Sequence, residues 1–180
     1  MESSKIEMKN AREIASILLE HKAVELNPDK PFTFSSGLSS PIYCDNRILI
    51  SDPGARIRVC QAFLQMLEPL SFDVVCGVAT AGIAWASWIA QALGKPMAYV
   101  RSSSKEHGKQ NQIEGRIQKG QSVVLIEDLI STGGSSLKAA QSILDQEIDV
   151  QAIASIFTYG FASSVKLFEK QGILFIRFPT

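Results

Sequence analysis

The 180-residue sequence lacks most of the features that mark specialised classes of protein. It has only three cysteines, an odd number without metal-type spacing, so we expect no disulfide framework and a reducing cytoplasm. Basic and acidic side chains balance at 18 each, which gives no global electrostatic reason to bind nucleic acid or a membrane surface. Charges interrupt the first residues, unlike a signal peptide or a membrane span. Any ligand site must therefore be built locally.

Two common nucleotide-binding patterns are also missing. The chain has no GxxxxGK[ST] sequence, so a nucleotide triphosphatase is not expected, and it has no GxGxxG dinucleotide fingerprint. The length and the 46% hydrophobic composition fit one domain that can bury a substantial core. We expect a single domain over residues 1–180, with an N-terminal hood over about 1–50 and a core over about 51–180.

What the chain does contain is an alternation of apolar runs and amphipathic stretches. This pattern predicts an α/β fold with a mostly parallel central sheet, flanked by helices on both faces, and a small N-terminal hood. In such sheets the ligand binds beyond the carboxyl ends of the strands. The expected strands are 72–78, 96–101, 122–128, 152–159 and 173–178, and the expected helices are 10–22, one that starts at Pro53, 83–93, 135–146 and 163–171.

The segment VVLIEDLISTGGSS carries the sharpest chemical signal. An apolar strand ends in Glu127 and Asp128, and the following turn, Ser131 to Ser135, opens a helix. Glycines let the backbone approach a ligand, and a helix start points free N–H groups at it, so this turn suits one phosphate group. The two acids could accept hydrogen bonds from sugar hydroxyls, directly or through hydrated Mg²⁺. The competing interpretation is an acidic turn that only caps the helix.

Residues 101–119 form a polar, basic segment that follows an expected strand. It has five basic residues against two acidic ones, and it contains His107 beside a glycine. A long loop of this kind can close over a site, and its positive charges could stabilise a leaving pyrophosphate. A solvated loop that only keeps the surface soluble is the alternative.

These segments together resemble a known family. VVLIEDLISTGGSS resembles the motif with which type I phosphoribosyltransferases bind phosphoribosyl pyrophosphate (PRPP). RSSSKEHG, with the spacing R-x-x-x-K-x-H-G, is similar to the catalytic loop of the orotate branch of that family. PFTFSSGLSSPIYCDNR resembles the N-terminal signature of the same branch, F-T-x-x-SG-x-x-SP-x-Y-x-D-x-R, and SIFTYGF extends the likeness. The resemblance covers roughly residues 10–175.

The resemblance implies an enzyme of pyrimidine (UMP) biosynthesis that joins orotate to PRPP and releases pyrophosphate and orotidine 5′-monophosphate. It implies Mg²⁺ held mainly through substrate and water, and a homodimer in which Arg101, Lys105 and His107 act across the interface. Catalytic roles fall to Lys105, His107 and Asp128, and orotate contacts to Tyr43 and Ser131. We expect the turn of Thr80, Ala81 and Gly82 to receive pyrophosphate. PRPP contacts are implied for Arg101, Lys105, His107, Glu127, Asp128, Leu129, Ile130, Ser131, Thr132, Gly133, Gly134 and Ser135.

The chain also departs from the family pattern. Ser35, Ser39, Ala81 and Ser102 stand where some members carry lysines, and the strand segment IFTYGF lacks an arginine that some members use for the orotate carboxylate. The group that binds this carboxylate is therefore open, and Arg47 could serve it or form a surface pair with Asp45. Two alternatives remain, a non-catalytic PRPP-sensing regulator of the same fold and a phosphoribosyltransferase for another base.

Overall fold

The structure is a computed structural model that describes residues 2–33, 37, 39–102 and 112–178. The helices are α1 (Glu2–Glu20), the 3-10 helix η1 (Asn46–Ser51), α2 (Pro53–Leu67), α3 (Ala81–Leu93), α4 (Gly134–Leu144) and α5 (Ala162–Lys170). The strands are β1 (Val24–Leu26), β2 (Phe32–Thr33), β3 (Ser39–Ser40), β4 (Ile42–Cys44), β5 (Val74–Val78), β6 (Met97–Val100), β7 (Ile113–Glu114), β8 (Ser122–Ile130), β9 (Asp149–Thr158) and β10 (Leu174–Arg177).

Six strands form the central sheet, in the order β10-β9-β8-β5-β6-β7. Every neighbouring pair is parallel except β6 and β7, which are antiparallel. The expected mostly parallel sheet is therefore confirmed. The two-residue edge strand β7 was not expected, because it lies inside the segment interpreted as loop up to Gly120.

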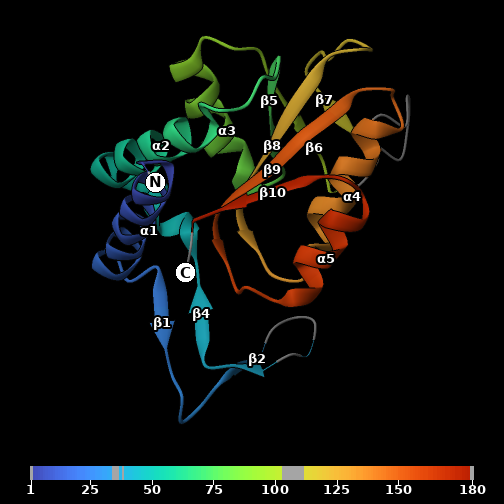
Figure 1. The fold of residues 1–180 in the computed structure, drawn as a ribbon. Coiled ribbons are helices and arrows are strands. Elements are labelled where there is room, and N and C mark those ends of the chain that lie inside the picture. The colour runs from blue at the N-terminus through green and yellow to red at the C-terminus, as the bar shows by residue number, and fades with distance from the viewer. Residues whose placement is uncertain (1, 34–36, 38, 103–111, 179–180) are drawn as a thin grey trace.

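Helices cover both faces of this sheet, as Figure 1 shows, with α1, α2 and α3 on one side and α4 and α5 on the other. Along β8, Val124 and Ile126 belong to the core cluster under α1, α2 and α3. Val123 and Leu125 belong to the second cluster, under α4 and α5. Successive side chains of a strand point to opposite faces, so a strand buried on both sides is apolar throughout. This explains the continuous apolar runs of the sequence.

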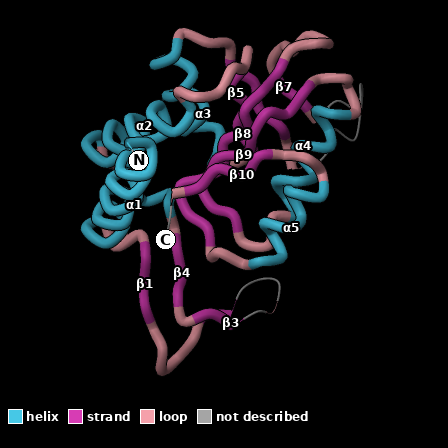
Figure 2. Tube along the Cα trace, in the orientation of Figure 1, coloured by secondary structure: helices cyan, strands magenta, loops and turns pink. Residues whose placement is uncertain are grey.

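The expected N-terminal hood consists of very short strands that project from one end of the molecule (Figures 1 and 2). β1 pairs antiparallel with β4, and β2 pairs antiparallel with β3. The chain then enters η1, which the sequence did not predict. These elements lead directly into α2 and bring the hood against the carboxyl end of the sheet.

Two helices can be compared with the starts that the sequence predicted for them. The side chain of Asp52 accepts a hydrogen bond of 2.6 Å from the amide of Ala55, with Pro53 in the first turn, as the sequence predicted. α1 begins at Glu2, well before the expected start at residue 10. None of the helices in the described part of the chain is both long and apolar enough to cross a bilayer.

Candidate active site

The acid pair lies where β8 continues beyond its neighbour β5. The last paired residues of these strands are Gly77 and Ile126, whereas β8 goes on pairing with β9 as far as Ile130. Glu127 and Asp128 are therefore inside β8, which continues to Ile130, whereas the sequence predicted that the strand ends with them. One side of their backbone faces the turn between β5 and α3 instead of another strand. This is the edge at which parallel sheets bind ligands.

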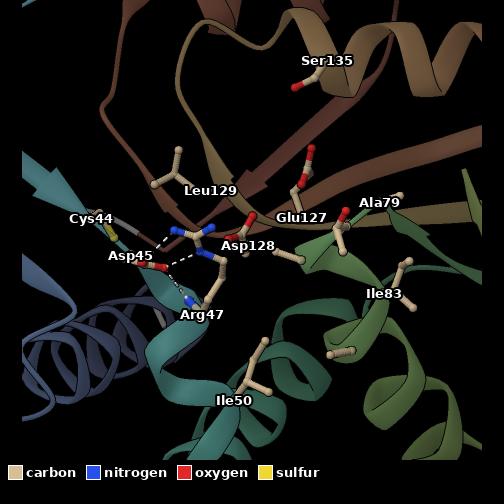
Figure 3. Close-up of a pocket in the computed structure, with 13 residues that line it drawn as sticks. Cys44, Asp45, Arg47, Ile50, Ala79, Ile83, Glu127, Asp128, Leu129 and Ser135 are labelled. Carbon is tan, nitrogen blue, oxygen red and sulfur yellow. Dashed lines mark hydrogen bonds and ion pairs between the residues drawn. The ribbon is translucent and has the colours of Figure 1, made fainter. Parts of the chain in front are cut away.

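Glu127 and Asp128 point to different parts of the site, as adjacent strand residues must. The hydroxyl of Ser136 on α4 donates a 2.9 Å hydrogen bond to the carboxylate of Glu127, which is 7% exposed. In Figure 3 the side chain of Glu127 points toward α4, and that of Asp128 lies beside Arg47. The pair thus links the start of α4 to the hood.

Both carboxyl groups hold their protons more tightly than usual. Burial raises the pKa of Glu127 to about 8, and the neighbouring charge of Asp128 adds to the rise. Burial also raises the pKa of Asp128, although backbone hydrogen bonds and the charge of Arg47 oppose the rise. Two neighbouring acids that share a desolvated place repel each other when ionised. The pair therefore favours a partner that brings positive charge or hydroxyl donors.

The start of α4 is open toward the cavity. Gly133 precedes the helix in the left-handed conformation with a φ of 82°, and no side chain among the described residues caps the first amides. A Cβ atom at Gly133 would lie 2.9 Å from the ring of Phe168, so the position requires glycine. A Cβ atom at Gly134 would meet nothing within 4 Å. The helix start thus has free N–H groups and open space, as an anion site needs.

The turn between β5 and α3 forms the opposite edge of the site. Its first peptide bond, Ala79–Thr80, is cis, and α3 begins at Ala81, two residues earlier than expected. Gly82 is consequently in the first turn of the helix, where a Cβ atom would lie 2.3 Å from the carbonyl oxygen of Ile126. Only glycine allows this contact between helix and strand. Thr80 and Ala81 face the cavity.

A hydrogen-bond network fastens the hood to the sheet. The amide group of Asn46, a fully buried residue, donates a 2.6 Å bond to the carbonyl oxygen of Asp128. The backbone N–H of Cys44 donates to the hydroxyl of Tyr159 at 3.2 Å. Burial raises the pKa of the Cys44 thiol to about 12, so it stays protonated and donates to the Asn46 side chain. The sequence contains no signal for the roles of Asn46 and Tyr159, because their partners are distant in the chain.

These elements enclose one open cavity of about 930 Å³ (Figure 3). We call Glu127 to Ser136 its phosphate wall and Cys44 to Arg47 its acceptor wall. The residues that line the cavity are Cys44, Asp45, Arg47, Ile50, Ala79, Thr80, Ala81, Ile83, Ala84, Glu127, Asp128, Leu129 and Ser135.

Arg101 and Tyr43 do not line this cavity, and the resemblance implies that Arg101 acts at the site of the partner subunit. Arg101 follows β6, and its guanidinium is 3.7 Å from the carboxylate of Glu114. Tyr43 does not line the cavity, and its ring packs against Phe32 at 5.4 Å. Lys105 and His107 fall outside the described residues.

Comparisons with known proteins agree with this geometry. The family model of the phosphoribosyl transferase domain matches residues 57–166. An orotate phosphoribosyltransferase of Listeria monocytogenes is 52% identical over 163 residues, which cover 89% of this chain and 78% of that protein. One from Coxiella burnetii is 50% identical and covers 92% of this chain and 80% of its own length. The crystal structure of orotate phosphoribosyltransferase from Aeropyrum pernix superposes with a TM-score of 0.80, at 30% identity over 91% of both chains.

The parallel sheet, the acid pair and the open start of α4 are thus those of a phosphoribosyltransferase, and the chain belongs to that family. Within the family, it belongs with the orotate phosphoribosyltransferases.

Proposed function

We propose that this chain acts in the cytoplasm as an orotate phosphoribosyltransferase of pyrimidine nucleotide synthesis. It transfers the 5-phosphoribosyl group of PRPP to orotate and releases pyrophosphate and orotidine 5′-monophosphate. One observation carries the proposal. The acid pair, in which Glu127 is buried and Asp128 partly buried, lies beside an uncapped helix start and shares a single cavity with the segment that resembles the orotate signature.

The acid pair has a clear role in this reaction. A ring nitrogen of orotate forms a bond to the anomeric carbon, and the carbon–oxygen bond to pyrophosphate breaks, with its electron pair leaving on the pyrophosphate oxygen. Positive charge develops on the ribose ring as that bond lengthens. Carboxylates fixed beside the ring stabilise this charge more than they stabilise the ground state. Glu127 and Asp128 would also accept hydrogen bonds from the ribose hydroxyls.

The two ends of PRPP then fall on opposite edges of the cavity. The 5-phosphate would accept hydrogen bonds from the amides and hydroxyls between Ser131 and Ser135, at the start of α4. Leu129 and Ile130 would carry backbone contacts to the same ligand. The pyrophosphate would lie near Thr80 and Ala81, with Gly82 keeping α3 close to β8. Arg101, Lys105 and His107 would neutralise it from the segment that follows β6.

The donor set of the site also fits Mg²⁺ brought in with the substrate. In the described part of the chain, no group of three or more histidine, cysteine or acidic residues could hold a metal by itself. Mg²⁺ commonly binds through one or two carboxylates together with waters and substrate phosphates. Glu127 and Asp128 would supply such carboxylates, because a bound cation would oppose the rise in their pKa values. Bound Mg²⁺ would screen the charge of the pyrophosphate as it leaves.

An absorbance assay tests the proposed reaction. Purified protein is mixed with Mg²⁺, PRPP and orotate, and the loss of orotate absorbance is followed, with hypoxanthine, adenine and uracil as alternative acceptors. We expect turnover of orotate and little or none of the other bases. If PRPP binds but no base is consumed, the chain is a PRPP-binding regulator and the proposal is wrong.

A complementation experiment tests the proposed homodimer. Lys105→Ala and Asp128→Asn should each inactivate the protein, but in a mixed dimer one of the two sites would have both residues intact. Random exchange of subunits makes half of the dimers mixed, and each mixed dimer has one intact site. About a quarter of all sites should therefore be active. Mixing without any recovery would show that Lys105 acts within its own subunit.

A further inference from the structure

Most of the charged residues that line the cavity are acidic, and one is basic. Of the residues that line it in the described part of the chain, Asp45, Glu127 and Asp128 are acids and Arg47 alone carries a full positive charge. An acceptor that bears a carboxylate must enter beside these acids, none of which can pair with it as an ion. An ionised group that leaves water without a partner is strongly disfavoured. Arg47 is thus the one described cavity residue that can receive such an acceptor as an ion pair.

The guanidinium of Arg47 is held in a fixed orientation. Its Nε and Nη2 atoms donate to the two carboxylate oxygens of Asp45 at 2.7 and 2.8 Å. Asp45 also accepts from the backbone amide of Arg47 at 3.1 Å, which ties the pair to the start of η1. Among the described residues only Asp45 accepts from Arg47, whose side chain is 65% exposed. Because a guanidinium has five N–H donors, donors remain free on a planar group that is already oriented.

Arg47 also lies on the side of the cavity where the acceptor belongs. Figure 3 shows Asp45 and Arg47 on one side of the acid pair, and Ala79 and Ile83 on the other. In a direct displacement at the anomeric carbon, the incoming base and the leaving pyrophosphate occupy opposite sides of that carbon. With pyrophosphate near the turn that begins at Ala79, the base must approach from the acceptor wall.

We infer that Arg47, oriented by Asp45, binds the carboxylate of the acceptor base and thereby selects orotate over bases that lack this group. The inference rests on the proposed function and identifies its specificity-determining residue. A charged hydrogen-bonded contact explains the selectivity physically, since only an acceptor with the carboxylate can accept hydrogen bonds from the donors that Asp45 leaves free on Arg47. The strand after the phosphate wall, which reads IFTYGF, offers no cation for this task.

A pair of nucleotides isolates this contact. Orotidine 5′-monophosphate and uridine 5′-monophosphate differ only in the carboxylate, so the ratio of their dissociation constants measures what the carboxylate contributes. We expect the unmodified protein to bind orotidine 5′-monophosphate about 10- to 100-fold more tightly, the range of one charged hydrogen-bonded contact. Arg47→Gln should bring the ratio close to one, and Arg47→Lys should leave an intermediate ratio because lysine cannot form the planar double contact. Calorimetric titration measures both constants.

Steady-state kinetics supply a second readout. Arg47→Gln should raise the KM for orotate about 10- to 100-fold while the KM for PRPP changes less than about twofold. Arg58→Gln is the matched control, because Arg58 also pairs with acids, Glu13 and Glu20, but does so on the outer surface of α1 and α2. It should leave both constants unchanged.

Three results would overturn the inference. They are an unchanged nucleotide ratio in Arg47→Gln, an unchanged KM for orotate, or a rise in the KM for PRPP instead, which would place Arg47 on the pyrophosphate. Thermal unfolding and PRPP titration of each variant test whether the site is folded. If Arg47→Gln does not fold, Arg47→Lys is used in its place. Absence of orotate turnover in the unmodified protein would reject the proposed function itself. Normal turnover together with an unaltered Arg47→Gln would reject only the role of Arg47.

Discussion

The phosphate wall and the acceptor wall face each other across one cavity, but they are built from different kinds of structure. The phosphate wall continues from β8, a nine-residue strand buried between two others, into an eleven-residue helix. The acceptor wall consists of the last residue of a three-residue strand, the capping residue Asp45 and the first two residues of a 3-10 helix. Core packing supports the first wall along the buried part of β8, whereas in the second wall Cys44 packs in the core and hydrogen bonds to Asp128 and Tyr159 hold the backbone.

The family match divides the chain in the same way. The general phosphoribosyl transferase model matches residues 57–166, which include the phosphate wall and leave out the acceptor wall. The amino-acid sequence of a wall that is part of the sheet cannot change without disturbing the core. The sequence of a wall held by local hydrogen bonds can change more freely. We infer from this contrast that the fold handles the phosphoribosyl group and that the hood selects the base.

The most damaging way to break the phosphate wall is to separate α3 from β8. Gly82→Ala would put a methyl group 2.3 Å from the carbonyl oxygen of Ile126, so the helix and the strand must move apart. We expect a loss of about 3 kcal/mol in the free energy of unfolding, measured with urea. Gly134→Ala is the matched control at another helix start, where a Cβ atom has open space. It should change stability by less than about 1 kcal/mol. Equal effects of the two variants would contradict the close contact.

A milder change should weaken the function of this wall without weakening its structure. Asp128→Asn removes a charge that raises the pKa of Glu127, so repulsion inside the pair falls. We expect PRPP to bind about 10- to 100-fold more weakly in calorimetric titration, while the melting temperature stays level or rises. Asp145→Asn, on the exposed end of α4, is the control and should alter neither quantity. Unchanged PRPP affinity would count against the sugar-binding role of Asp128.

The same contrast governs what the sequence could predict. The β8–α4 unit was predicted closely, because an uninterrupted apolar run, an acid pair and two glycines each indicate a local structure. The hood was predicted only in outline. The segment NRILIS has no helical periodicity, yet it forms η1 because Asp45 caps its first turn. Its two- and three-residue strands are too short to produce a periodic signal.

Long-range contacts set the limit of sequence interpretation at the site itself. Asn46 is fully buried, and its partner is the carbonyl of Asp128, 82 positions away in the chain. Gly82 was interpreted as a turn residue, but its role in the structure comes from the carbonyl of Ile126. Neither of these contacts leaves a local pattern.

The pH dependence of stability should distinguish the walls further. Glu127 has an ordinary pKa of 4.5 and a folded-state pKa of about 8, so between these values the folded protein holds a proton that the unfolded chain has released. The free energy of unfolding should therefore fall as the pH rises toward about 8 and level off above it, by up to about 1.4 kcal/mol per pH unit for one proton. The raised pKa of Asp128 acts in the same direction.

Glu127→Gln isolates this effect, because its amide oxygen can still accept the hydrogen bond from Ser136 while the side chain no longer titrates. Urea unfolding at a series of pH values should give a flatter profile for the variant than for the unmodified protein. Glu169→Gln, a carboxyl on the exposed side of α5, serves as the control and should keep the original slope. Parallel profiles for Glu127→Gln and the unmodified protein would show that Glu127 is already ionised in the folded state.

The smallest effect is expected from loosening the acceptor wall alone. Tyr159→Phe removes the hydroxyl that accepts from the backbone N–H of Cys44, while the ring can keep its packing against Phe157 and Phe161. One neutral hydrogen bond contributes about 0.5 to 1.5 kcal/mol, and loss of this bond should lower the free energy of unfolding by about that amount. The KM for orotate should rise about two- to fivefold, because the wall is less well fixed, while the KM for PRPP stays constant. Tyr99→Phe, on β6 outside the cavity lining, should change neither constant. An equal rise in both constants would mean that the two walls are mechanically coupled, and the separation of base choice from phosphoribosyl binding would not hold.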